Sequence, residues 1–260
     1  MFDPWIDALF AVLAPVPLSI GVIAIAAAGF LRGFVGFGNS ILIVVVFSLL
    51  YGPVFAVPFA ALASLPPTIQ LLPVTLRESE RGFVLPFAVA VFAAAPVGVL
   101  ALVAVDPDLL KIGIAGLVLV SVALLYRGWR PARPFGAGGL AGVGVGSGLA
   151  QGIAGAGGMV VAAAALSRPG SAAQQRANTI GGITAVGLCN FPPLLWHGLF
   201  TREVVMLSVI MLPVYLAGTW VGSRFFTAGG SRHYRNAALA VLAAVGVVAL
   251  GISLRAWVLG

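Results

Sequence analysis

Two glycine-rich breaks interrupt hydrophobic segments at matching places in the two halves of the chain. The first break covers residues 33–39 and the second covers residues 152–158, and three of their glycines align. Glycine-interrupted hydrophobic segments at corresponding places in two repeats are typical of the binding site of a membrane carrier. The candidate ligand-binding residues lie in and beside the breaks, with one asparagine from further along the second half: Arg32, Gly33, Gly36, Gly38, Asn39, Ser40, Gln151, Gly152, Gly155, Gly157, Gly158, Met159 and Asn190.

The breaks can create a site for an anion without any charged side chain. A half-helix is expected to begin after each break, near Asn39 in the first half and near Gly158 in the second. The first amides of such a helix have no partner within it, and this end of the helix dipole is positive. In two inverted halves, both helix starts would converge near the middle of the membrane, where they could bind an anion together.

Arg32 adds a positive charge at the first break, and its counterpart at the second break is the neutral Gln151. Arg32 lies 17 residues after Pro15, where the first hydrophobic run begins, so it is expected near mid-depth. An unpaired arginine there costs at least ~2.5–3.5 kcal/mol. No acidic residue lies in the interior of an apolar run, so an anionic substrate is a candidate partner for the planar guanidinium. The alternative is a crossing helix from which Arg32 extends to the interface.

The composition predicts an integral membrane protein that crosses the bilayer several times. Of the 260 residues, 61% are hydrophobic and only 8% are charged, and the mean hydropathy is +1.12. So few charges could not cover the surface of a soluble domain of this length. The first thirty residues carry Asp3 and Asp7 where a signal peptide has positive charge, so we expect this segment to belong to the fold.

Several other classes of function are not expected from these residues. The net charge of +7 comes from arginines in short loops between apolar runs, which orient a membrane protein and do not indicate nucleic-acid binding. The single Cys189 excludes an internal disulfide and an all-cysteine metal cluster. His197 and His233 lack metal-ligand spacing. No nucleophile–base pair is apparent, so we expect neither an enzyme nor a metal or cofactor.

The hydrophobic runs divide the chain into two repeats, residues 1–130 and residues 131–260. The runs that follow the breaks are too short to cross the membrane alone, because a spanning helix needs about 20 residues. Each half is therefore expected to contain a broken or re-entrant helix pair followed by three transmembrane helices. The expected runs are 15–31, 40–50, 54–73, 83–104, 109–126, 136–151, 158–167, 177–196, 203–223 and 237–254.

Smaller features repeat as well. A proline pair is expected to end the third run at residues 66–67, and a second pair at residues 192–193 stands near the end of the corresponding run. Ala94 and Gly98 match Gly218 and Gly222, a spacing of small residues that lets helices approach closely. The latter pair could pack within the monomer, the favoured interpretation, or form a dimer interface. The sequence therefore predicts an all-α membrane protein that is a monomer or a homodimer.

The positions of the charges predict a topology. If both broken pairs are re-entrant, three basic residues lie on one side of the membrane and ten on the other, which is assigned to the cytoplasm. Both termini are then expected outside a bacterial inner membrane, and the second repeat is inverted relative to the first. A competing count of up to ten spans fits the charges less well. The ten arginines are Arg77, Arg81, Arg127, Arg130, Arg133, Arg168, Arg176, Arg224, Arg232 and Arg235.

The two breaks resemble those of the sulfite exporter TauE/SafE family, also called the toluene sulfonate uptake permease group. The resemblance covers nearly the whole chain and is most specific at residues 152–158, with a weaker match at residues 33–39. Asn39 stands where the family has a further glycine, and Met159 follows the second motif. The resemblance implies a membrane carrier of sulfite, sulfoacetate, other sulfonates or related small anions.

These observations predict alternating access around a central anion site, with Arg32 as the countercharge. An anion that leaves a negative-inside cell gains about 2.3 kcal/mol per charge per 100 mV, so export needs no coupled ion. Glu78 and Glu80 remain candidate proton carriers, although a solvated loop is the simpler explanation. The alternatives are an anion channel that uses the same helix ends and a carrier of a non-sulfur anion. The expected partners are the small anion and the lipid bilayer.

Overall fold

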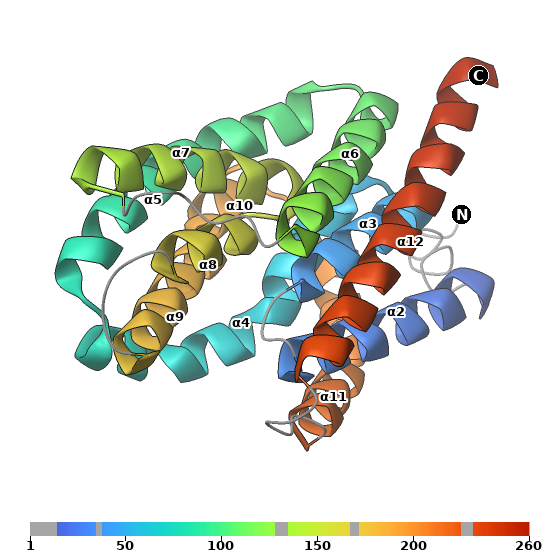
Figure 1. Ribbon diagram of the computed structural model, residues 1–260. Coiled ribbons are helices and arrows are strands. Elements are labelled where there is room, and N and C mark those ends of the chain that lie inside the picture. The colour runs from blue at the N-terminus through green and yellow to red at the C-terminus, as the bar shows by residue number, and fades with distance from the viewer. Residues whose placement is uncertain (1–14, 35–37, 128–134, 167–171, 225–230, 260) are drawn as a thin grey trace.

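The computed structural model describes residues 15–34, 38–127, 135–166, 172–224 and 231–259, and every regular element within these ranges is an α-helix (Figure 1). The prediction of an all-α fold is therefore confirmed. The helices are α2 (Pro15–Phe34), α3 (Asn39–Tyr51), α4 (Pro53–Glu78), α5 (Arg81–Ala104), α6 (Pro107–Tyr126), α7 (Ala137–Ala154), α8 (Gly158–Leu166), α9 (Ala172–Cys189), α10 (Phe191–Trp196), α11 (Arg202–Arg224) and α12 (Ser231–Leu259).

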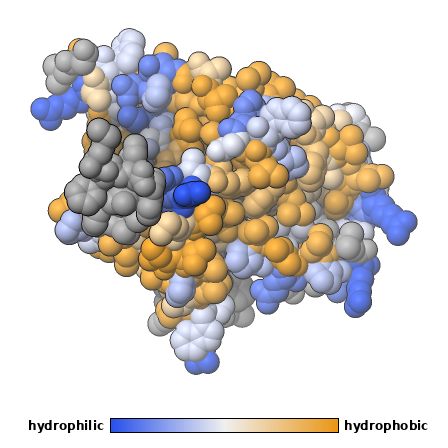
Figure 2. Space-filling view, turned by 180° about the vertical axis from the view of Figure 1, so that it is seen from behind, coloured by the Kyte–Doolittle hydropathy of each residue, from blue (hydrophilic) through white to orange (hydrophobic). Residues whose placement is uncertain are grey.

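The outer surface is apolar, as expected of a protein that spans a membrane. Among the described residues, α2, α5, α11 and the Pro53–Gln70 part of α4 are long and apolar enough to cross. Large apolar side chains such as Leu85, Val89 and Val209 point outward. Figure 2 shows a broad apolar face with hydrophilic residues mostly toward its periphery. Because lipid tails are the only environment that suits such a surface, this is a multi-pass membrane protein.

The two halves pack against each other in an exchanged pattern. The first described helix of the first half, α2, packs along α11 of the second half, and the first described helix of the second half, α7, packs along α5 of the first. The α4–α9 pair and the α6–α12 pair also join corresponding helices of the two halves (Figure 1). Two repeats related by a two-fold axis would produce such a pattern, but the repeat relation stays a prediction. The inversion of the second half relative to the membrane stays a prediction.

Small residues allow the close approach of these exchanged helices. A Cβ atom added at Gly218 of α11 would lie 2.5 Å from the carbonyl oxygen of Ala26 in α2. A Cβ atom added at Gly98 of α5 would lie 2.7 Å from the carbonyl oxygen of Leu149 in α7. Real Cβ atoms do not come this close to a backbone oxygen, so both contacts require glycine. The small-residue spacing at Gly218 therefore packs helices within one chain.

The proline pairs behave differently from each other. Residues 66–67 lie inside α4, which continues to Glu78, so the expectation that this pair ends its helix is wrong. Residues 192–193 stand in the first turn of the short α10, after a break at Asn190. Proline is tolerated in a first helical turn because the amides there have no intrahelical partner. Inside a membrane helix, packing against neighbouring helices allows proline as well.

Two buried apolar clusters flank the centre of the molecule. The larger cluster joins α2, α3, α4 and α6, and the rings of Phe47 and Phe59 stack in it with their centroids 4.3 Å apart. The smaller cluster joins α5, α7, α8 and α9 around Phe83 and Phe87. Residues of α3 belong to the larger cluster and residues of α8 to the smaller one, so the packing of the core positions the helices that follow the two breaks.

Candidate functional site

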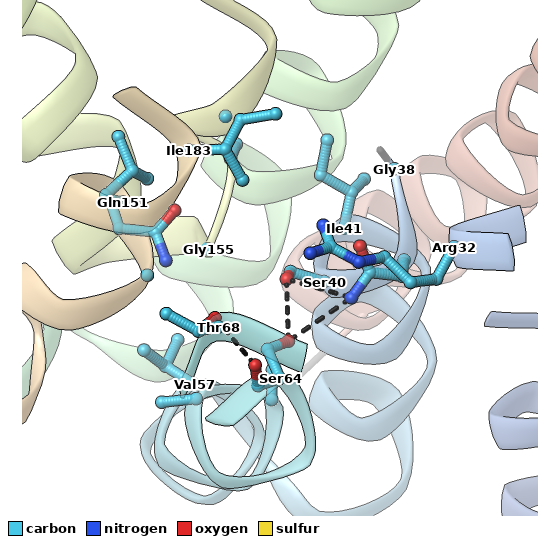
Figure 3. A pocket seen from close by; sticks show the side chains of 17 residues that line it. Arg32, Gly38, Ser40, Ile41, Val57, Ser64, Thr68, Gln151, Gly155 and Ile183 are labelled. Atoms are coloured by element: carbon cyan, nitrogen blue, oxygen red, sulfur yellow. Dashed lines mark hydrogen bonds between the residues drawn. The ribbon is translucent and has the colours of Figure 1, made fainter. Parts of the chain in front are cut away.

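A cavity with both polar and apolar walls lies between the two breaks and the middle of α4 (Figure 3). Its volume is about 50 Å³. One water molecule needs only ~10–15 Å³, so the cavity has room for a small polyatomic ion. Ser64 and Thr68 line it from the centre of the Pro53–Glu78 helix, which places the cavity away from both ends of that helix. The polar side chains of its wall are Arg32, Asn39, Ser40, Ser64, Thr68 and Gln151.

The starts of both half-helices line this one cavity. Gly38 and Asn39 reach it from the first break, where α3 begins. Gly155 and Gly158 reach it from the second break, where α8 begins. A Cβ atom added at Gly155 would lie 3.1 Å from a methyl group of Val44, so the second break packs directly against α3. The positive ends of two helix dipoles therefore face the same space.

The backbone at the breaks uses a conformation that favours glycine. Gly38 precedes α3 with a φ angle of +86°, and Gly155 follows α7 with a φ angle of +63°. The amide of Gly155 donates to the carbonyl oxygen of Gln151 at 3.0 Å, and the amide of Ala156 donates to that of Ala150 at 3.3 Å. These bonds end α7 with the paired pattern common at left-handed helix termini.

Three side-chain hydrogen bonds hold the second break in place. The amide of Gly157 donates to the side-chain oxygen of Gln151 at 3.0 Å, and the hydroxyl of Ser147 donates to the carbonyl of Gly157 at 2.6 Å. The side-chain amide of Asn190 donates to the backbone carbonyl of Gln151 at 2.8 Å. Gln151 thus both lines the cavity and fixes the backbone beside it, whereas Asn190 is buried behind the break.

Arg32 is the one charged residue among the described residues that line the cavity. It lies in the last turn of α2 and is half-buried. Arg32 and Gln151 reach toward the cavity from opposite sides, and the guanidinium of Arg32 extends toward Ser40 (Figure 3). Because much of the remaining wall is apolar, its charge is poorly screened there and favours an anion.

A hydrogen-bond network fixes the start of α3. The side-chain amide of Asn39 donates to the hydroxyl of Tyr215 at 2.9 Å and to that of Ser64 at 3.2 Å. The hydroxyls of Ser40 and Ser64 lie 3.2 Å apart. The side-chain amide has two hydrogens, and both are used in hydrogen bonds within the protein. Arg32, Ser40 and Gln151 are therefore the better placed donors for a ligand.

Tyr215 is the residue that sequence reasoning missed. Its side chain is almost fully buried in α11, and it supports the first break from the second half of the chain. The sequence could have drawn attention to Tyr215 because it is a tyrosine inside an apolar run. A tyrosine hydroxyl that is buried in this way normally needs a hydrogen-bond partner. The sequence does not show which partner that is.

Some predicted residues do not line the cavity. Gly33 packs against the backbone of α11, where an added Cβ would lie 2.8 Å from the amide of Ser223. Gly152 packs against α5, where an added Cβ would lie 2.7 Å from the carbonyl oxygen of Ala95. Gly157 lies behind the cavity wall, held by Ser147. Gly36 and the side chain of Met159 lie outside the described part of the chain.

The fold and the cavity define a class: an α-helical, multi-pass membrane protein with two helix starts and an arginine at one internal polar site. The model of the family described as "Sulfite exporter TauE/SafE" matches residues 21–249, which include both breaks and every residue of the cavity wall. The chain therefore belongs to this family. It is a family of membrane transporters, and its name points to sulfur anions such as sulfite. Neither a curated protein nor a solved structure matches the chain.

Proposed function

We propose that this protein is a secondary transporter that carries small sulfur oxyanions across the bacterial inner membrane. Sulfite is the leading substrate, and sulfoacetate and other sulfonates belong to the same class. The observation that carries the proposal is the meeting of Arg32 with the starts of α3 and α8 at one cavity. Together with the family membership, this site favours a small anion with several oxygen atoms.

The chemistry of the wall suits an oxyanion. The planar guanidinium of Arg32 can donate two parallel hydrogen bonds to two oxygens of one anion. Ser40 and Gln151 can donate to a third oxygen from the other walls (Figure 3). Among the described residues of the wall there is no carboxylate that would repel the anion.

The exchanged packing of the two halves supports alternating access. Residues 1–130 and 131–260 would form two inverted repeats, with both termini on the outer side of the membrane. The α4–α9 contact then lies at the centre of the molecule, and both helices contribute to the cavity wall. A rocking motion of the helices around α2 and α11 against those around α5 and α7 would open this wall to one side at a time.

The proposed direction of transport is export without a coupled ion, because the membrane potential drives an anion outward.

Glu80 serves a structural role in the turn between α4 and α5. Its backbone amide donates to the side-chain oxygen of Asn178 at 2.8 Å, and the side-chain amide of Asn178 donates to its carboxylate at 3.2 Å. Replacing Glu78 and Glu80 together by glutamine should leave transport intact at equal expression. Loss of transport would instead favour proton coupling.

The decisive experiment compares substrates and one arginine variant in the purified full-length protein. Sulfite, sulfoacetate, taurine and sulfate are tested by thermal shift, and efflux of the stabilising anion is then measured from proteoliposomes. Arg32→Gln should abolish the stabilisation, whereas the matched Arg255→Gln, at an exposed position in α12, should not. Stabilisation that persists in Arg32→Gln would remove Arg32 from the site. Stabilisation by a non-sulfur anion alone would reassign the substrate.

A channel is the second candidate function, because the same helix ends would line an anion pore. Planar bilayer recording separates the two mechanisms. A carrier gives saturable flux without unitary currents, whereas discrete current steps that grow with anion concentration would identify a channel.

A further inference from the structure

A second, smaller cavity lies between α3, α6 and α12, away from the central site. It has a volume of about 10 Å³. Its polar wall residues are Ser48 of α3, Ser253 of α12 and Lys111 of α6, and its other wall residues are apolar. The cavity therefore lies where the first half-helix, α3, meets the last helix of each half, α6 and α12.

The two serines of this cavity lack hydrogen-bond partners. Ser48 and Ser253 are 2% and 1% exposed, and neither hydroxyl has a partner among the residues that the structure describes. Hydroxyls elsewhere in the protein bond to the backbone of their own helix, as that of Ser208 in α11 does to the carbonyl of Val204 at 2.7 Å. Buried polar groups in native proteins almost always have a partner, and an ordered water or ion commonly supplies it.

The size and the charge of this cavity indicate which ligand it holds. One water molecule needs about 10–15 Å³ and two to four polar partners. The ammonium of Lys111 is paired with the carboxylate of Asp108 at 2.7 Å, so its charge is balanced by a group outside the cavity and attracts an ion only weakly. Serine hydroxyls both donate and accept, which matches a neutral ligand that does the same.

We infer that one fixed water molecule occupies this cavity and bridges the hydroxyls of Ser48 and Ser253, with Lys111 beside it. The bridge fastens the C-terminal part of α3 to α6 and α12. Because the N-terminal end of the same helix lines the central cavity, the bridge helps to hold that end in position.

The test is a double-mutant cycle on the full-length protein in detergent. Ser48→Ala and Ser253→Ala should each lower the melting temperature by roughly 2–4 °C. The double variant should lose no more than the larger single loss, because neither hydroxyl is then left buried without a partner. Ser208→Ala is the control for Ser253→Ala: its hydroxyl bonds within its own helix, so its effect should add to that of Ser48→Ala.

Four results would overturn the proposal. The losses from Ser48→Ala and Ser253→Ala could add fully, or neither variant could change the melting temperature. Alternatively, bromide in place of gluconate could stabilise the wild type but not the double variant, which would identify a halide site. A high-resolution density map provides the direct check. It should show one peak within hydrogen-bonding distance of both hydroxyls, and an empty site would contradict the proposal.

Discussion

The side-chain amide of Asn39 donates a hydrogen bond of 2.9 Å to the hydroxyl of Tyr215, a residue 176 positions further along the chain. The bond ties the start of α3, in the first half, to α11 of the second half. It also directs the donors of Asn39 away from a ligand and toward the protein interior. The first break is therefore held by a residue that is not part of it.

We predict that Tyr215→Phe lowers both the stability of the protein and its affinity for the anion. The ring remains, but Asn39 loses an acceptor, and a hydrogen bond of this kind contributes about 0.5–1.5 kcal/mol. Thermal unfolding and ligand-induced thermal shifts measure the two effects. Tyr126→Phe, at an exposed tyrosine near the end of α6, is the matched control. Equal behaviour of the two variants would mean that Tyr215 does not position the first break.

Substitutions of Arg32 should separate its charge from its shape. Arg32→Lys keeps the charge but loses the planar pair of donors, so binding of the sulfur oxyanion should weaken by roughly 10-fold. Arg32→Gln loses both and should weaken binding by roughly 100-fold, since a hydrogen bond to a charged group contributes about 1.5–3 kcal/mol. Titration calorimetry measures both affinities. Full retention of affinity in Arg32→Lys would show that only the charge matters.

Gly155→Ala should destabilise the second break. The φ angle of +63° costs a non-glycine residue roughly 1–2 kcal/mol, and the new methyl group would press on Val44. Gly146→Ala, inside the preceding helix α7 and with open space around it, should be neutral or stabilising. Chemical or thermal unfolding of both variants gives the comparison. A neutral Gly155→Ala would mean that the break tolerates another backbone conformation.

Asn190→Ala should lower the stability of the protein even in the absence of a ligand. Its side chain bonds to the carbonyl of Gln151 behind the cavity, so the melting temperature of the ligand-free protein should fall. Ser40→Ala, at the cavity wall, should instead reduce mainly the shift caused by the anion. If Asn190→Ala changed only the ligand-induced shift, Asn190 would be a direct ligand, as the sequence alone predicted.

Gly218→Ala should separate α11 from α2, because the added methyl group would collide with the carbonyl of Ala26. We expect a loss of several degrees in melting temperature and no change in oligomeric state. Gly251→Ala, with open space around it in α12, is the control. Light scattering of the detergent-solubilised protein measures its mass. Loss of a dimer in Gly218→Ala alone would show that Gly218 also contributes to an interface between chains.

Much of the fold follows from neighbouring residues in the sequence. The expected run 83–104 corresponds to α5 (Arg81–Ala104), and the run 109–126 corresponds to α6 (Pro107–Tyr126). Hydrophobic length and the conformational freedom of glycine are local properties, so the helices and the two breaks could be predicted. Residues 66–67 show the limit of such rules, because packing against neighbouring helices keeps proline inside α4.

The sequence by itself determined the membrane class, the helices, the two breaks and the arginine beside the first of them. Only the tertiary structure decided which of these residues share a cavity. Gly33 and Gly152 turn toward neighbouring helices, while Ser64 and Thr68 of α4 complete the wall. The reason is physical: backbone conformation depends on adjacent residues, whereas the partner of a buried hydroxyl such as that of Tyr215 depends on how distant helices pack.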